Sequence, residues 1–222
     1  MAGEIVGLPA IACRLREDHP IYGLMPSLDG PPWEQLSIVG MAAELVTALK
    51  CVRPHGPYVL AGICSGGPIV MEMARLLQNR GDTIELLILI DPRVRSRRNL
   101  SYLASRVAHH ARNKSATETI ARRARRAAGR DSTTPFEAPE FYNRLSVARD
   151  AYDVNPLVGV PAVLVTTDDY SGRFAISQKV WRRALPDGFA TRGIPFSHDT
   201  LLFPPAVDAL ASVIDDLVAA GS

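Results

Sequence analysis

The run Gly62-Ile63-Cys64-Ser65-Gly66-Gly67 has the residue types of a tight turn that presents a nucleophile. It directly follows an apolar stretch and directly precedes an amphipathic one, so a strand should end and a helix should begin around Cys64. Glycines on both sides suit a sharp turn, because a side chain there would collide with neighbouring backbone. The expected chemistry is attack by the Cys64 sulfur, helped by the unpaired amides of the helix start, with the Ser65 N–H donating to an oxyanion.

The same turn has two other interpretations. Free cysteine is commonly just a buried apolar residue, and an inert Cys64 in a glycine-rich turn would give a similar pattern. Gly66-Gly67 also suggests a phosphate-binding loop, but the Lys-Ser/Thr pair that such a loop needs is absent. A nucleophilic cysteine is therefore the favoured hypothesis.

A cysteine nucleophile needs a base, and the chain has five histidines. His198 lies in a loop between a predicted last strand and the last helix, which is where the histidine of an α/β hydrolase lies. His19 and His55 each precede a strand, and His55 is at the wrong end of the sheet for chemistry. His109 and His110 belong to an arginine-rich stretch. His198 is thus the predicted general base.

An acid that orients the histidine should close another strand. Asp91 ends the run LLILID, in the strand expected beside that of Cys64, whereas Asp168 and Asp169 end a later strand. An aspartate at the end of a strand can also simply cap the following loop. The residues by themselves leave Asp91 and Asp168 as alternatives.

Apolar, β-branched runs alternate with amphipathic stretches along most of the chain. This alternation predicts an α/β fold in which a mostly parallel sheet carries helices on both faces. Pro20 to Leu24 is expected to add one more short strand. The main predicted strands are Pro57 to Ile63, Thr83 to Ile90 and Pro161 to Thr167, and the predicted helices are Trp33 to Val52, Gly66 to Arg80, Phe174 to Ala184 and Pro204 to Ala219.

Residues Arg93 to Asn155 interrupt the alternation, and we interpret them as a mostly helical insertion over the sheet. Within them, Arg93 to Arg130 holds twelve basic residues against the single acid Glu118. Clustered arginines alone are weak support for nucleic-acid binding. A solvated helical face is the simpler explanation, and long-range attraction of an acidic partner domain is a further alternative.

The overall composition narrows the class of protein. A chain of 222 residues, 47% of them hydrophobic, can bury one good core, so a single domain over 1–222 is expected. A net charge of +2 gives no argument for nucleic acid, and no stretch is apolar enough to span a membrane. The N-terminus lacks the layout of a signal peptide, and three scattered cysteines suit a reducing cytoplasm rather than disulfides or a metal site.

Several of these stretches together resemble one known family, the thioesterase domains that terminate non-ribosomal peptide and polyketide synthetases. The similarity covers most of the chain outside the arginine-rich insertion, and the tract around PHGPYVLAG with the following turn is its most specific part. The matching stretches are Gly3 to Val6, Pro20 to Leu24, Leu28 to Gly30, Pro54 to Leu60, Gly62 to Gly67, Glu72 to Arg75, Leu86 to Asp91, Trp181 and the loop around His198.

The resemblance implies an α/β-hydrolase fold in which the acid follows the strand after the nucleophile, which selects Asp91. It implies that 93–155 is a lid over the acyl pocket, inserted into a core formed by 1–92 and 156–222. It also implies that acyl or peptidyl thioesters arrive on the phosphopantetheine arm of a partner carrier protein, with no other cofactor. The triad expected is Cys64, His198 and Asp91, with Ser65 at the oxyanion.

The chain departs from the family in two ways. The family usually has serine at position 64, and an acyl-cysteine is itself a thioester, so transfer to an amine or hydroxyl is possible as well as hydrolysis. The family also has a central strand before the loop that matches Ala2-Gly3, and that loop supplies a second oxyanion donor. This chain starts inside that loop, so we expect either that the true start lies upstream or that the chain is a fragment. The alternative function is a catalytically impaired, truncated domain that binds acyl groups or carrier proteins.

Overall fold

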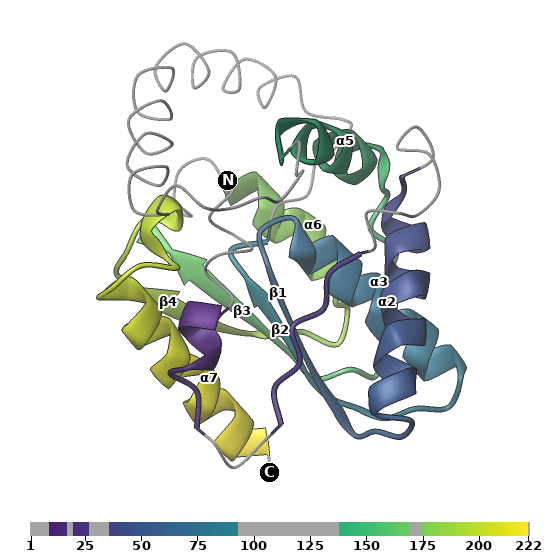
Figure 1. The fold of residues 1–222 in the computed structure, drawn as a ribbon, viewed down its shortest axis with the longest axis horizontal. Coiled ribbons are helices and arrows are strands. Elements are labelled where there is room, and N and C mark those ends of the chain that lie inside the picture. Colours follow the sequence, from purple (N-terminus) through teal and green to yellow (C-terminus); the bar gives the residue numbers. More distant parts are fainter. Residues whose placement is uncertain (1–8, 17–19, 27–35, 93–137, 169–174, 222) are drawn as a thin grey trace, which may run out of the picture.

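The computed structural model describes residues 9–16, 20–26, 36–92, 138–168 and 175–221 of the chain (Figure 1). Within these residues the centre is a sheet in the order β1-β2-β3-β4, and every neighbouring pair of strands runs parallel. The predicted fold class, a parallel sheet with helices on both faces, is confirmed. The strands are β1 (Tyr58–Ile63), β2 (Ile84–Ile90), β3 (Ala162–Thr167) and β4 (Ala190–Ile194).

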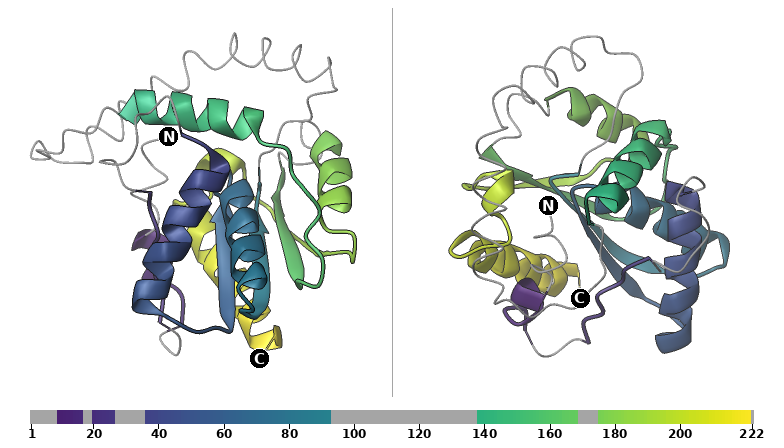
Figure 2. Two further views of the ribbon diagram at one scale, coloured as in Figure 1. Left: turned by 90° about the vertical axis from the view of Figure 1, so that its right-hand side faces the viewer. Right: turned by 45° about the horizontal axis from the view of Figure 1, so that its top comes forward.

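The helices form a layer on each side of this sheet, as Figures 1 and 2 show from three directions. Helices α2, α3 and α6 pack on one face, and α5 packs on the same side near the ends of the strands. Helix α7 covers the other face together with the helical residues 9–12. The helices are α2 (Ile38–Val52), α3 (Gly66–Asn79), α5 (Ala138–Ala151), α6 (Ala175–Ala184) and α7 (Ala206–Gly221).

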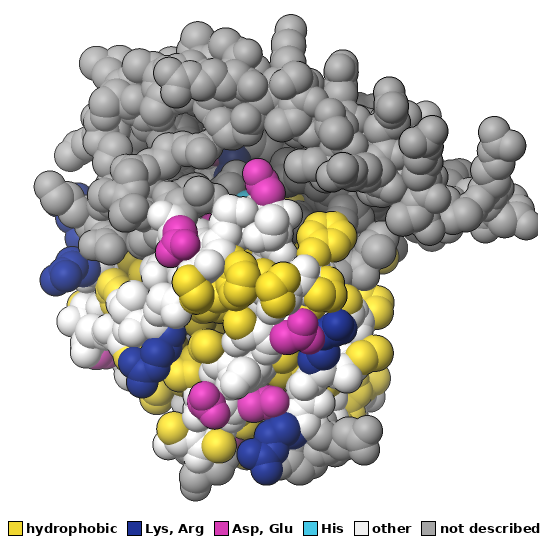
Figure 3. Space-filling model, turned by 90° about the vertical axis from the view of Figure 1, so that its left-hand side faces the viewer, with side chains coloured by type: hydrophobic (Ala, Val, Ile, Leu, Met, Phe, Trp, Pro, Cys, Tyr) yellow, Lys and Arg dark blue, Asp and Glu magenta, His cyan; other side chains and the backbone are white. Residues whose placement is uncertain are grey.

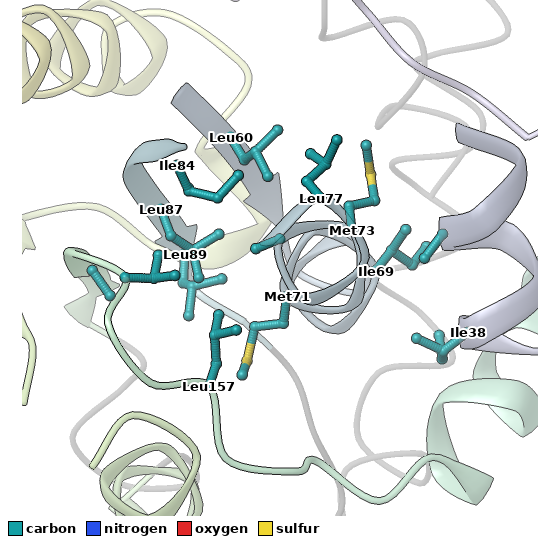
Figure 4. Close-up of a cluster of buried hydrophobic side chains, with 14 of the residues drawn as sticks. Ile38, Leu60, Ile69, Met71, Met73, Leu77, Ile84, Leu87, Leu89 and Leu157 are labelled. Atoms are coloured by element: carbon teal, nitrogen blue, oxygen red, sulfur yellow. The ribbon is translucent and has the colours of Figure 1, made fainter. Parts of the chain in front are cut away.

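Strand β2 shows why a continuous apolar run becomes a buried parallel strand. Its residues alternate between the two layers: Leu87 and Leu89 face the α3 side, while Ile88 and Ile90 face the α7 side, and none is more than 1% exposed. Glu85, near the start of the strand, is only partly buried, and from Leu86 to Ile90 both faces are covered and every residue is apolar. Figure 4 shows the α3 side, where the leucines of the sheet meet Met71, Met73 and Leu77.

The strand predicted at Pro20 to Leu24 is wrong, because these residues pair with no strand. Ile21 and Tyr22 are each 46% exposed, and Leu24 packs against the layer of α2 and α3. The run is short, starts with a proline that has no N–H to donate, and includes Gly23. Its apolar residues therefore gave a strand-like pattern without the hydrogen bonds of a strand.

Helix α2 also begins later than the predicted Trp33. Ser37 caps it, because its hydroxyl accepts a hydrogen bond of 3.0 Å from the Gly40 N–H. A serine in this position satisfies one of the amides that a helix start leaves unpaired, so the helix begins at Ile38.

The predicted insertion at 93–155 is described only in its last part. Residues 93–137, which hold the arginine-rich run, lie outside the described residues, whereas Ala138–Ala151 forms helix α5. On the face drawn in Figure 3, the described basic and acidic side chains are interspersed among apolar ones. No helix among the described residues is long and apolar enough to cross a membrane.

Candidate active site

Cys64 occupies the turn between β1 and α3 with a backbone that few residues adopt. Its φ is 54°, and its N–H donates a 2.9 Å hydrogen bond to the carbonyl oxygen of Ile90 at the end of β2. Its side chain is buried, at 1% exposure. A positive φ in a residue other than glycine costs roughly 1–3 kcal/mol, so the packing around the turn has to impose it.

The neighbouring Gly62 explains how the turn can be so sharp. A Cβ atom on Gly62 would lie 2.7 Å from the carbonyl oxygen of Gly66 and 2.6 Å from a methyl carbon of Val70. The start of α3 therefore approaches the end of β1 more closely than any residue with a side chain at position 62 allows.

Asp91 lies beside this turn and is hydrogen bonded to His198. The N–H of Asp91 donates to the carbonyl oxygen of Val165 at 2.7 Å, and its side chain is completely buried. One carboxylate oxygen, Oδ2, is hydrogen bonded to Nδ1 of His198, whose side chain is 10% exposed. Asp91 directly follows Ile90, whose carbonyl oxygen accepts the hydrogen bond from the Cys64 N–H. Cys64, Asp91 and His198 therefore lie together at the carboxyl ends of the strands.

His198 reaches this edge from the loop that follows β4. Strand β4 ends at Ile194, and His198 starts a short 3₁₀ turn over His198–Thr200 that Ser197 stabilises through a 3.1 Å contact between hydroxyl groups. The carboxyl ends of parallel strands lie together, so loops that are distant in sequence can meet there. A hydrogen bond through Nδ1 leaves Nε2 as the nitrogen available for proton transfer.

The other candidate acids and histidines lie elsewhere. Asp168 follows β3 with an exposed side chain, and its N–H donates to the Phe196 carbonyl oxygen at 3.1 Å. His55 is exposed before β1, at the opposite end of the sheet from Cys64. Outside the described residues lie Asp169, His19, His109, His110 and the Ala2-Gly3 loop.

Ser65 is the N-cap residue of α3 and directly follows Cys64. Its side chain contacts Arg149, a residue that the sequence analysis did not single out. The Ser65 hydroxyl oxygen lies 3.9 Å from Sγ of Cys64 and accepts a 3.2 Å hydrogen bond from Nη1 of Arg149 in α5. The first amides of a helix have no partner inside it, which leaves the Ser65 N–H suited to a developing negative charge. Nothing in the sequence marks Arg149 among the other arginines of the insertion.

No group of three or more His, Cys, Asp or Glu side chains that could hold a metal ion occurs in the part of the chain that the structure describes. Cys13 and Cys51 are free and exposed, away from the buried Cys64.

Comparison with known families identifies the family of the chain. The family model for the thioesterase domain matches residues 31–217, which is most of the chain. The chain belongs to the thioesterase domain family. The family that the sequence resembles is thus confirmed, and with it an enzyme class that acts on thioester bonds.

The curated relatives of this thioesterase domain are large synthases, and it matches a small part of each. It is 40% identical over 75 residues to a dimodular nonribosomal peptide synthase of Bacillus subtilis, an alignment that covers 33% of this chain and 3% of the relative. It is 36% identical over 83 residues to an orsellinic acid synthase of Emericella nidulans, covering 37% of this chain and 4% of the relative. The thioesterase domain thus spans a few per cent of the length of these relatives.

Solved structures support the same fold. The Vlm2 thioesterase domain, solved with a bound dodecadepsipeptide, superposes with a TM-score of 0.65 at 20% identity, covering 96% of this chain and 88% of that one. At that identity the likeness concerns the fold, and the arrangement of the strands and helices is what the two share.

Proposed function

We propose that this thioesterase domain releases an acyl or peptidyl group from a carrier-bound phosphopantetheine thioester through an acyl-enzyme on Cys64. The observation that carries the proposal is the hydrogen bond between His198 and the buried Asp91, formed beside a cysteine held at positive φ. A nucleophile, a base and an orienting acid at one edge of a sheet form the arrangement used for acyl transfer.

In the first half of the reaction, Nε2 of His198 takes the proton of the Cys64 thiol while Asp91 holds Nδ1. The sulfur attacks the thioester carbonyl carbon, and the Ser65 N–H donates to the resulting oxyanion. When the tetrahedral intermediate collapses, the carbon–sulfur bond to phosphopantetheine breaks, and His198 returns the proton to the leaving thiolate. The acyl group is then bound to Cys64.

In the second half, an acceptor takes the acyl group from Cys64. His198 removes a proton from the acceptor, the acceptor attacks the acyl carbon, and Cys64 leaves as a thiol. Because the acyl-enzyme is a thioester, an amine or a hydroxyl can serve as acceptor as well as water. The chemistry needs a partner carrier protein to deliver the substrate, and no further cofactor.

The similarity to a peptide synthase and an orsellinic acid synthase supports a carrier-bound substrate. A carrier-bound acyl or peptidyl thioester is therefore the substrate class that we propose.

Mass spectrometry after incubation with acyl thioesters of N-acetylcysteamine, a mimic of the phosphopantetheine end, tests the acyl-enzyme. We expect an acyl adduct on the Cys64 peptide of the wild type, slower formation in His198→Ala, and none at this position in Cys64→Ala. Cys13 and Cys51 are exposed and serve as internal references for non-enzymatic acylation. Adducts on those two cysteines but not on Cys64, in a folded protein, would favour a domain that only binds acyl groups or carriers.

A further inference from the structure

Arg149 of α5 is held close to the candidate nucleophile by several hydrogen bonds. Its side chain is 13% exposed, and Nη2 donates to the Ser146 hydroxyl at 2.8 Å. Its Nε and Nη2 donate to Oδ1 of Asp150 at 3.4 and 3.2 Å. On the other side, Nη1 donates to the Ser65 hydroxyl at 3.2 Å. The guanidinium plane is thus fixed from two sides.

The donors of Arg149 are not all used. A guanidinium has five N–H groups. The bonds to Ser146, Asp150 and Ser65 engage the Nε group, both groups on Nη2 and one on Nη1. The second N–H on Nη1 has no acceptor within the described residues. A donor left without an acceptor in a mostly buried group costs free energy, which an acceptor on a bound ligand would recover.

This donor lies close to where an acyl chain would be attached. Nη1 of Arg149 and Sγ of Cys64 are each within 4 Å of the same Ser65 hydroxyl oxygen. The carbonyl carbon of an acyl-enzyme is bonded to Sγ, and an oxygen on the β-carbon lies a few ångströms further along the chain. An acyl chain that leaves Sγ towards α5 would place an acceptor at that position within hydrogen-bond reach of Nη1.

The charge around Arg149 favours a neutral acceptor over an anion. The Asp150 carboxylate is 12% exposed and pairs with the opposite edge of the guanidinium. A carboxylate or phosphate group at Nη1 would meet the field of Asp150 as well as that of Arg149. A carbonyl oxygen accepts the same hydrogen bond without a full negative charge.

We propose that Arg149 is a specificity-determining residue that donates a hydrogen bond to a carbonyl oxygen on the β-carbon of the acyl group. The site therefore selects 3-oxoacyl chains over saturated chains of the same length. This inference rests on the proposed acyl-enzyme at Cys64, which it extends to a class of substrate.

The test compares 3-oxobutyryl and butyryl thioesters of N-acetylcysteamine, which differ by one carbonyl oxygen. A hydrogen bond from a charged donor corresponds to a preference of about 10- to 100-fold, so Arg149→Met should reduce the ratio of the two kcat/KM values by that factor. Arg149→Lys should restore part of the ratio, because lysine keeps a charged donor. Arg182→Met, at an exposed arginine of α6, is the matched control and should leave the ratio unchanged.

Binding separates this inference from the proposed function. The 3-oxobutyryl and butyryl amides of N-acetylethylenediamine cannot be cleaved, and calorimetry gives their affinities for the wild type and Arg149→Met. A 3-oxo preference that the methionine variant loses supports Arg149 even if neither thioester turns over, in which case only the acyl-enzyme is wrong. Turnover of both thioesters with an unchanged ratio, or an equal loss for both, overturns the role of Arg149 and leaves the acyl-enzyme in place.

Discussion

At the scale of single residues, the backbone strain of this domain lies at its candidate site. Cys64 and Asp91 have φ values of 54° and 41°, and within the described residues they are the two positions other than glycine at positive φ. Each directly follows a strand, and each amide is held by the carbonyl oxygen of a neighbouring strand. The parallel sheet therefore stabilises two unfavourable conformations side by side, which presents the thiol and the carboxylate at the same edge.

The choice between two acids gives a prediction for activity. Asp91→Asn keeps the shape of the side chain but removes the charge that orients and stabilises the His198 imidazole. We expect kcat/KM for an acyl thioester to fall by about 10³- to 10⁴-fold without loss of the fold. Asp168→Asn is the matched control, since its exposed side chain should change the rate by less than about 3-fold. A larger loss in the Asp168 variant than in the Asp91 variant would assign the acid to Asp168.

The close approach of backbone at the turn gives a prediction for stability. Gly62→Ala places a methyl group 2.7 Å from the Gly66 carbonyl oxygen, so the turn has to open. We expect a loss of roughly 1–3 kcal/mol in the free energy of unfolding by urea, together with weaker acylation of Cys64. In Gly66→Ala the new methyl meets nothing within 4 Å, and stability should stay the same or rise slightly. Equal losses in the two variants would mean that the close approach does not limit the turn.

At the scale of elements, a polar cluster fastens the end of the insertion to α3. Glu72 of α3 is 7% exposed, accepts a 2.7 Å hydrogen bond from the Tyr152 hydroxyl and pairs with Arg75. Arg75 also donates to the carbonyl oxygens of Asn155 and Pro156, at 2.7 and 3.2 Å. The chain that returns from α5 to β3 is thus bound to the helix that begins at the candidate nucleophile.

This cluster should make stability depend on alkaline pH. Burial, and then the hydrogen bond to Glu72, raise the pKa of Tyr152 from 10.0 to about 12. The folded state therefore holds the hydroxyl proton more tightly than the unfolded chain does. The resulting stabilisation is complete below pH 10 and is lost as the pH rises towards 12.

Tyr152→Phe removes the titrating group and is the variant that checks this dependence. In urea unfolding at pH 8, the wild type should be more stable by about 1 kcal/mol, the usual contribution of one hydrogen bond. The difference should shrink steadily when the measurement is repeated above pH 10. A difference that grows, or stays constant up to pH 11, would contradict a raised pKa at Tyr152.

At the scale of the whole molecule, two apolar clusters share one sheet. Leu77 of α3 and Leu210 of α7 are both fully buried, on opposite faces of the strands. Since the residues of β2 alternate between the clusters, loss of packing on one face weakens the strands that the other face needs. The described domain should therefore unfold as one unit.

The variants Leu77→Ala and Leu210→Ala test whether the two faces unfold cooperatively. Each leaves a cavity in a fully buried cluster and should lower the free energy of unfolding by about 2–5 kcal/mol. Trp181 is buried in the cluster on the α3 side, so its fluorescence reports on that face, whereas far-ultraviolet circular dichroism reports on the helices of both faces. In both variants the two probes should give the same urea midpoint. Separate midpoints for the two probes in the Leu210 variant would show that the faces unfold independently.

The regular elements were predictable because their signals are local. The apolar runs ending at Ile63, Ile90 and Thr167 became β1, β2 and β3 within one residue of the predicted bounds, since buried parallel strands need no polar alternation. The glycine-rich turn was also recognisable from the sequence, because only small residues fit where the start of α3 approaches the end of β1 so closely. The same local rule failed at Pro20 to Leu24, where apolar character came without strand partners.

The sequence by itself determined the order of strands and helices, the turn at Cys64 and the choice of His198 among five histidines. The residue pattern left Asp91 and Asp168 as alternatives, and the family resemblance selected Asp91. Only the tertiary structure shows that the Asp91 carboxylate contacts His198, across 107 positions. It alone also brought Arg149 to Ser65, across 84 positions. Such contacts depend on which strands are neighbours and how a helix packs over their ends, and short-range patterns of residue type do not encode that geometry.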